Sequence, residues 1–312
     1  MHAWVELIEA VQPQCVVLDY APVAQLAVDL LQWRAFHLTN GFDAPPTDCP
    51  MYARVRPESE LGQRNASRVA ELSANITLVG ERFSGRRDCT LASILDYPSK
   101  IYECIAETDP YGPRDDGLCI GPLGSHADVV DVPWPDSWLQ HRRVFAHLRN
   151  VSGATDLLDE LRLTDAVTLC VWRDAPADVM ERYRNTNVRI VRQPVRLERV
   201  LPQADAVVNY GSTALVCHTL LAGKPQLVVP TDFEKLKVAQ RVMHQGAGIV
   251  WHRGDSSPRE AIRQLMHSPA RAQVARAISE NYPPARLQAN RNRFAREVIG
   301  YLDLQQVDAF AA

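Results

Sequence analysis

Short apolar runs alternate with amphipathic stretches through the second half of the chain. The runs are Val144–Leu148, Val167–Trp172, Val188–Val191, Ala206–Asn209, Gln226–Val229 and Gly248–Val250. Helical periodicity lies between most of them, as at Ala154–Leu161 and Val179–Arg184. Nearly continuous apolar strands joined by helices predict a doubly wound parallel sheet. Ligands bind such sheets beyond the carboxyl ends of the strands, where the strand order reverses.

The first part of the chain shows the same α/β order on a smaller scale. The expected elements are a helix over Ala3–Val11, a strand at Cys15–Leu18, a helix over Val23–Trp33, a strand at Ala35–Leu38 and a long helix over Gly62–Val79. A strand, a helix and a second strand in that order predict a βαβ unit. The apolar pattern at Leu91–Leu95 is compatible with a strand or a helical turn.

Composition along the chain predicts two domains. Pro133, Pro135 and the polar residues up to Gln140 are typical of a linker. We therefore expect a first domain over residues 1–140 and a second over residues 141–285. A long helix from Leu287 to Leu304 falls in the last segment, residues 286–312.

The stretch Leu201–Pro230 carries the clearest local signal. An apolar strand ends at Asn209, the small-residue turn Gly211-Ser212-Thr213 follows, and a helix runs to the stop at Gly223 before the next strand. The first amides of a helix have no partner within it, and its dipole is positive there, so this turn suits a phosphate or diphosphate. The alternative is that Ser212 only caps the helix.

Composition and charge narrow the function classes. The chain has 312 residues, a formal net charge of −3 and a pI near 6.3, which gives no electrostatic reason to expect nucleic acid. No apolar run reaches the roughly 18 residues that cross a bilayer, and the N-terminus lacks signal-peptide features. Seven cysteines without CxxC spacing predict reduced thiols in a cytoplasmic protein. No metal-ligand spacing is present.

The block around Gly211 resembles the donor-sugar signature of nucleotide-sugar glycosyltransferases of the GT-B fold, of the MGT and UDP-glycosyltransferase kind and related to the MurG type. The matching residues are Ala204-Asp205-Ala206-Val207-Val208, Gly211, Leu220-Leu221-Ala222-Gly223, Pro225 and Val228-Val229-Pro230, followed by Ala239, Arg241-Val242 and Gly246-Ala247-Gly248. The spacing holds without a gap. The segment from Gln12 to Leu38 resembles the late part of the acceptor-side domain of the same enzymes.

The resemblance implies two Rossmann-like doubly wound domains, an incomplete acceptor-side domain and a nucleotide-sugar donor domain, with the last helix crossing back to the first domain. It also implies transfer of a hexosyl group from a nucleotide-diphosphate sugar, such as a UDP sugar, to a hydroxyl of a small-molecule, lipid or glycan acceptor, without a cofactor beyond the donor or a metal ion. Two alternatives stay open. One is a non-catalytic nucleotide-sugar-binding or scaffold protein of the same fold, and the other is a nucleotide-sugar 2-epimerase-like enzyme.

The resemblance assigns donor-site roles by position. They fall on Asn150, Ser152 and Gly153 for phosphate, Gln193 and Val195 for the base, Tyr210, Gly211, Ser212 and Thr213 for the diphosphate, His218 for the ribose, and Glu234 and Lys235 for the sugar. Four positions depart from the family pattern. Tyr210 stands for a histidine, Ser212 for a glycine, His218 for a glutamate and the pair Glu234-Lys235 for Asp-Gln. Plain turns, a packed helix histidine and a solvated helix start are the structural alternatives.

Asp19 is the candidate catalytic residue of the first domain. It matches the aspartate that orients the family's catalytic histidine, and its carboxylate can itself accept a proton from a hydroxyl. The segment that carries the histidine in the family has no counterpart here, so the chain is expected to be a fragment, a mis-started product or a domain that lacks its first strands. A chain without that histidine is expected to have low glycosyltransferase activity. The strand Cys15–Leu18 should then form an exposed sheet edge that a partner chain can cover.

Overall fold

The computed structural model describes residues 1–47, 58–124, 129–132, 134, 142–252, 254–255 and 257–300. The chain divides into two compact units that interleave along the sequence. Unit 1 comprises Met1–Glu103, Pro113–Ile120 and Leu287–Ala312, and unit 2 comprises Cys104–Gly112 and Gly121–Arg286. The expected boundary near residue 140 lies outside the described residues.

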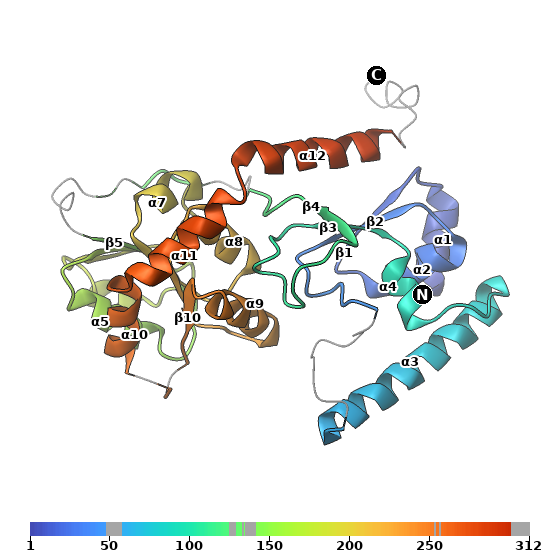
Figure 1. Ribbon diagram of the computed structural model, residues 1–312, viewed down its shortest axis with the longest axis horizontal. Coiled ribbons are helices and arrows are strands. Elements are labelled where there is room, and N and C mark those ends of the chain that lie inside the picture. Colours follow the sequence, from blue (N-terminus) through green and yellow to red (C-terminus); the bar gives the residue numbers. More distant parts are fainter. Residues whose placement is uncertain are drawn as a thin grey trace. The chain divides into compact units, whose positions relative to one another are not determined.

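Unit 1 is built on a parallel sheet whose described strands have the order β1-β2-β3-β4 (Figure 1). The strands are β1 (Val16–Asp19), β2 (Ala35–Thr39), β3 (Ser99–Tyr102) and β4 (Gly117–Cys119). The helices are α1 (His2–Val11), α2 (Pro22–Leu31), α3 (Glu60–Ser84), α4 (Leu91–Asp96) and most of α12 (Pro284–Ile299). The expected helix–strand–helix–strand–helix order of the first 80 or so residues is confirmed, with shifts of a few residues at the ends of its elements.

Local hydrogen bonds settle the ambiguous pattern at Leu91–Leu95, which forms the helix α4. The Ser93 amide donates to the Thr90 hydroxyl (3.1 Å), and the Thr90 amide donates to the Ser93 hydroxyl (2.9 Å). This reciprocal pair is a capping box, which satisfies two backbone donors at once and favours a helix start over an extended strand.

Strands β3 and β4 were not expected from the sequence because polar residues interrupt their apolar patterns. Lys100 in β3 is almost fully buried, and its ammonium lies 2.9 Å from a carboxylate oxygen of Asp116. The hydroxyl of Tyr102 donates to the other carboxylate oxygen at 2.9 Å. A buried lysine is stable only with such a partner, and the partner precedes β4 in the chain.

Strand β1 is an edge strand among the described residues, because it pairs with β2 alone. Leu18 packs into the core at 2% exposure, whereas Val17 on the opposite face is 48% exposed. Helix α1 adds a stripe of exposed apolar side chains, Trp4, Leu7 and Val11. Among the described residues, β1 is therefore a partly exposed edge of the sheet.

Unit 2 is built on a second parallel sheet, whose described strands have the order β10-β9-β8-β5-β6-β7. The strands are β5 (Arg143–His147), β6 (Val167–Val171), β7 (Val188–Val191), β8 (Ala206–Asn209), β9 (Gln226–Val228) and β10 (Gly248–Val250). The helices are α5 (Ala154–Arg162), α6 (Ala177–Arg182), α7 (Leu197–Gln203), α8 (Thr213–Leu221), α9 (Phe233–His244), α10 (Pro258–Met266) and α11 (Pro269–Glu280). All six expected strands are confirmed. Helix α7 was not expected, since Pro202 in its last turn reads as a break.

The strand order of unit 2 reverses at its first strand. From β5 the chain builds β6 and β7 on one side, then crosses to build β8, β9 and β10 on the other. The carboxyl ends of β5 and β8 therefore flank the switch point at which ligands bind in doubly wound sheets.

Helix α12 contributes to the core of unit 1. The helix was expected over Leu287–Leu304; it begins at Pro284, and residues beyond 300 lie outside the described part. The ring of Phe294 packs edge-on against Phe36 of β2, with 5.5 Å between the centroids. The Asn290 side-chain amide donates to the carbonyl of Cys119 at 2.6 Å, which ties the helix to β4.

Candidate functional site

A buried amide network fixes the turn that follows β8. Asn209 is fully buried, and its carbonyl oxygen Oδ1 accepts from the Gly211 amide at 2.8 Å. Its Nδ2 donates to Oε1 of Gln226 on β9 (2.8 Å), and Nε2 of Gln226 donates to the carbonyl of Val216 on α8 (3.2 Å). The strand end, the turn and the next helix are thereby held as one rigid piece.

Gly211 is required at the centre of this turn. Its φ of +94° lies in a region that L side chains rarely adopt. A Cβ placed there would come within 2.8 Å of the Cβ of Lys235 and 3.2 Å of Val228. The start of α9 thus packs directly on the turn, and only a glycine leaves room for it.

The N-terminus of α8 is uncapped. Ser212 is the residue before the helix, and its side chain caps none of the first amides. The hydroxyl of Thr213, a residue that is 94% buried, has no hydrogen-bond partner among the described residues. A buried hydroxyl beside uncapped helix amides suits an anion, because an anion accepts hydrogen bonds from donors that are otherwise unsatisfied.

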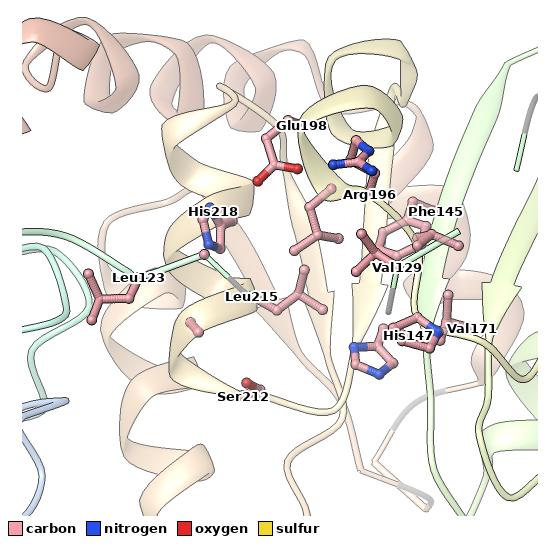
Figure 2. Close-up of a pocket in the computed structure, with 15 residues that line it drawn as sticks. Leu123, Val129, Phe145, His147, Val171, Arg196, Glu198, Ser212, Leu215 and His218 are labelled. Carbon is pink, nitrogen blue, oxygen red and sulfur yellow. The ribbon is translucent and has the colours of Figure 1, made fainter. Parts of the chain in front are cut away.

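A pocket of about 490 Å³ opens beside this helix end, within unit 2 (Figure 2). Ser212 before α8, with Leu215 and His218 in that helix, forms one side. Phe145, His147 and Val171 of β5 and β6 lie across from them. The remaining lining residues are Leu123, Gly124, Val129, Pro194, Val195, Arg196, Leu197, Glu198 and Ala214. The size and the mainly apolar walls are typical of a site for a nucleotide-sized molecule.

The wall near residues 194–196 is held by backbone hydrogen bonds. The Val130 amide donates to the carbonyl of Pro194 (2.9 Å), and the Arg196 amide donates to the carbonyl of Val130 (3.3 Å). The Arg196 guanidinium in turn lies 3.1 Å from a carboxylate oxygen of Asp131. Its charge is therefore partly neutralised within the wall.

His147 brings a neutral imidazole to the pocket. Burial, and next the positive charge of Arg149, lower the pKa of His147 to about 4. At pH 7 the ring therefore acts as a hydrogen-bonding group without charge. It contacts the ring of Tyr210 edge-on, with 5.1 Å between the centroids.

The pocket brings together only some of the residues that the sequence singled out. Val195, Ser212 and His218 line it, whereas Gln193 does not. Tyr210, Gly211 and Thr213 do not line the pocket; they lie in the turn and helix start on either side of Ser212, which does.

Asn150, Ser152 and Gly153, which were expected to bind phosphate, follow β5 but do not form one group. Asn150 accepts a hydrogen bond from the indole of Trp172 (3.2 Å), so its side chain is held against the end of β6. Gly153 has φ +89° and precedes α5, and Ser152 between them is exposed. None of the three lines the pocket. Their phosphate role stays a prediction.

Glu234 and Lys235 lie at the start of α9, outside the pocket walls. The Lys235 ammonium lies 2.6 Å from a carboxylate oxygen of Asp232, whose other oxygen accepts from the Lys235 amide. Hydrogen bonds and the charge of Lys235 lower the pKa of Asp232 although burial opposes them. The Lys235 ammonium is thus paired with Asp232, the residue that caps α9. A role of Lys235 in binding the sugar stays a prediction.

Asp19 lies in unit 1, exposed at the carboxyl end of β1. Other carboxylates lie nearby: burial raises the pKa of Glu103, and the negative charges of Asp19 and Asp43 add to the rise. Asp43 is itself held by His37, whose Nε2 lies 2.9 Å from its Oδ2. The strand ends of unit 1 therefore gather acid–base groups.

Sequence reasoning missed three of these groups: His147, Arg149 and Glu103. His147 ends β5, Arg149 follows it, and Glu103 follows β3. Their position directly after parallel strands is the signal that could have found them, since strand ends carry ligand sites in such folds. In the described part of the chain no three His, Cys, Asp or Glu side chains are grouped to hold a metal ion. No helix among those residues is long and apolar enough to cross a membrane.

Part of unit 2 matches a known protein family. Residues 155–285, within unit 2, match the family model described as Erythromycin biosynthesis protein CIII-like, C-terminal domain. No curated protein matches the chain significantly in sequence.

Solved glycosyltransferases share the fold. The glycotransferase of kitacinnamycin is 20% identical with a TM-score of 0.67, over 95% of this chain and 78% of that one. CalG4, the calicheamicin glycosyltransferase, is 20% identical with a TM-score of 0.67, over 96% and 78%. VinC, solved in complex with dTDP, is 19% identical with a TM-score of 0.63, over 94% and 75%. The chain therefore has the GT-B fold, with two parallel-sheet units.

Proposed function

We propose that this protein is a glycosyltransferase that binds a nucleoside-diphosphate sugar in the unit 2 pocket and transfers the sugar to an acceptor hydroxyl. The observation that carries the proposal is the start of α8, which no side chain caps and where the buried Thr213 hydroxyl has no partner among the described residues, beside a nucleotide-sized pocket. A diphosphate supplies the acceptors that these donors lack. The family match over residues 155–285 supports the same assignment.

Each part of the nucleotide has a complementary region. The apolar wall made by Phe145, Val171 and Leu215 suits a base, next to the backbone of Val195. His218, the sixth residue of α8, suits the ribose. VinC, which shares the fold, was solved with dTDP, and this supports a nucleoside diphosphate as the ligand. The likeness to the MurG type, the cytoplasmic location and the absence of a cofactor beyond the donor remain predictions.

Nucleotide binding tests the proposal directly. We expect one of UDP, dTDP, GDP or ADP to bind the protein in titration calorimetry and to raise the melting temperature of unit 2. Saturation at 100 times Kd stabilises a folded state by about 2.7 kcal/mol, which a thermal scan detects. No heat and no stabilisation with any of the four at millimolar concentration would contradict the proposal.

A matched pair of variants locates the site. Ala214 is the second residue of α8, is exposed, and lines the pocket, whereas Ala270 is the exposed second residue of α11 and does not line it. Ala214→Trp should fill the pocket and abolish binding by steric exclusion. Ala270→Trp introduces the same side chain at the same helix position and should leave binding unchanged.

A non-catalytic binding protein of the same fold is the second candidate. The pairing of Lys235 with Asp232 favours it, because it withdraws from the sugar a residue that stands at a sugar-contacting position of the resembled family. Release of free nucleoside diphosphate from a donor sugar over time distinguishes the transferase from the binding protein, since only the transferase breaks the glycosyl–phosphate bond.

A further inference from the structure

The loops after β5 and β8 leave the unit 2 sheet side by side. His147 of β5 is paired in register with Asn209 of β8, so the residues two positions further on, Arg149 and Gly211, leave the sheet at the same level. These loops flank the switch point of the sheet. A side chain on the β5 loop is therefore well placed to reach a ligand at the start of α8.

Arg149 and Tyr210 are in contact across this gap. The guanidinium carbon of Arg149 lies 4.7 Å from the centroid of the Tyr210 ring, within the range of a cation–π interaction. The Tyr210 ring is only 6% exposed and is contacted edge-on by His147. A buried, packed ring is a rigid support, so it limits where the guanidinium can lie.

The charge of Arg149 is available to a ligand. The residue is exposed, and no carboxylate among the residues the structure describes forms an ion pair with it. Two other cations of the site differ in this respect, because Lys235 is paired with Asp232 and Arg196 with Asp131. Stacking on a ring satisfies a guanidinium face but leaves its N–H donors free.

An independent observation shows that the space next to this pair is built for an anion. The Thr213 hydroxyl is buried without a partner among the described residues, and the first amides of α8, a nine-residue helix, are uncapped. Tyr210 lies only two residues before Ser212, which precedes that helix. Neutral donors and a cation thus converge from two adjacent loops.

We propose that Arg149 binds the diphosphate of the nucleotide and that Tyr210 is the residue that positions its guanidinium; this rests on the proposed function. The planar guanidinium suits two parallel hydrogen bonds to phosphate oxygens, while the amides of α8 and the Thr213 hydroxyl donate to the remaining oxygens. Arg149 supplies the positive charge that the neutral phenol of Tyr210 lacks.

Calorimetry with the nucleoside diphosphate that wild type binds best, its monophosphate and the free nucleoside tests the role of Arg149. Arg149→Ala should weaken diphosphate binding by roughly 10- to 100-fold, as expected for loss of a charge-assisted pair of hydrogen bonds. The monophosphate should lose less, and the nucleoside should bind as it does to wild type. Equal diphosphate affinity in the variant and wild type would overturn the inference.

A second arginine on the same strand provides the control. Arg143 begins β5 and stacks on Trp134 with 5.4 Å between guanidinium carbon and ring centroid, but it lies at the opposite end of the strand. Arg143→Ala therefore removes the same kind of interaction from the same strand and should leave diphosphate affinity unchanged. A loss equal to that of Arg149→Ala would indicate a general effect on unit 2 and contradict a specific site.

Two variants of Tyr210 test the positioning role. Tyr210→Phe keeps the aromatic face and should bind the diphosphate within about threefold of wild type. Tyr210→Leu loses that face and should bind about 3- to 10-fold more weakly. A Phe variant as weak as Arg149→Ala would mean that the hydroxyl, rather than the ring, matters, and the positioning role would be wrong.

The NMR titration of His147 gives a readout that needs no ligand. Because the Arg149 charge is one of two causes that lower the pKa of His147, Arg149→Ala should raise that pKa while burial still holds it below the ordinary value. An unchanged pKa would show that the guanidinium is not held near this ring and would overturn the inference. If wild type binds no nucleoside diphosphate, the proposed function itself fails; if it binds and Arg149→Ala binds equally, only this inference fails.

Discussion

At the scale of single residues, Gly211 determines whether the α8 turn can form. Its left-handed φ of +94° and the 2.8 Å approach of the Lys235 Cβ are two separate constraints, one on the backbone and one on packing. The first would cost any L side chain roughly 1–2 kcal/mol, and the second would force the start of α9 away from the turn.

We therefore predict that Gly211→Ala lowers the free energy of unfolding of unit 2 by about 2–4 kcal/mol and abolishes nucleotide binding. Urea denaturation and calorimetry measure the two effects. Gly112→Ala is the matched control, because Gly112 has a similar φ of +104° and no atom closer than 3.9 Å to the added Cβ. Gly112→Ala should lower the free energy of unfolding only by the backbone strain, roughly 1–2 kcal/mol, and should leave nucleotide binding intact. Equal losses in the two variants would contradict the packing argument.

Residue roles could be predicted only where turn residues and helix ends in the sequence fix a position. The position of Ser212 follows from the order of strand, turn and helix, and that of His218 from the family resemblance; both line the pocket. Arg149 does not follow, because a loop cation has no signature until the ring it stacks on is known. Lys235 shows the converse, since its pairing with Asp232 depends on the geometry of the α9 cap.

At the scale of elements, the contrast between β1 and β8 is the clearest. Strand β1 pairs with one described neighbour and has Val17 about half exposed, whereas β8 lies between β5 and β9 with every residue buried. Exchange of backbone amides requires that their hydrogen bonds open, and an edge strand opens at a lower free-energy cost.

We predict that the amides of Val16–Asp19 exchange faster than those of Ala206–Asn209. Hydrogen exchange followed by mass spectrometry on peptides covering the two strands measures the difference. The helix α8, buried against the same unit 2 core as β8, serves as an internal reference for slow exchange. Equal protection of β1 and β8 would mean that another polypeptide covers the β1 edge, and a partner chain there would then gain support.

Elements could be predicted where one physical signal dominates. Strands β6 and β8 of unit 2 were expected because every residue in them is buried, so that apolar residues dominate their sequences. Strand β3 was missed because Lys100 is buried only by virtue of Asp116, which is 16 residues away in the chain. Such an ion pair allows a charged residue to be buried within a strand, and no local sequence pattern reveals the pair.

At the scale of the whole molecule, the two units carry different chemistry. The pocket proposed to bind the nucleotide, and the hydrogen-bond donors at the start of α8, belong wholly to unit 2. The carboxylates Asp19, Asp43 and Glu103 belong to unit 1, at the ends of its strands. The presence of two parallel sheets was predictable from the order of the elements. The interleaving of the units was not, because residues 104–112 join unit 2 through tertiary contacts alone.

This separation predicts that substrate binding and turnover respond to different residues. Asp19 can take the proton from an attacking hydroxyl as the new glycosidic bond forms and the nucleoside diphosphate leaves. We predict that Asp19→Asn lowers the single-turnover rate of nucleoside diphosphate release by roughly 10²- to 10⁴-fold, the usual contribution of a general base. The Kd of the nucleoside diphosphate should change less than about twofold, since Asp19 lies outside the pocket of unit 2.

The control for this last variant is Asp115→Asn, an exposed carboxylate of unit 1 that no strand end presents. It removes the same charge and should leave both rate and affinity unchanged. Asp19→Asn should also lower the pKa of Glu103, because it removes one of the negative charges that raise it, and NMR titration reports this shift even if turnover is slow. A full turnover rate in Asp19→Asn would exclude Asp19 as the base and leave Glu103, a half-buried carboxyl whose pKa burial raises, as the next residue to replace.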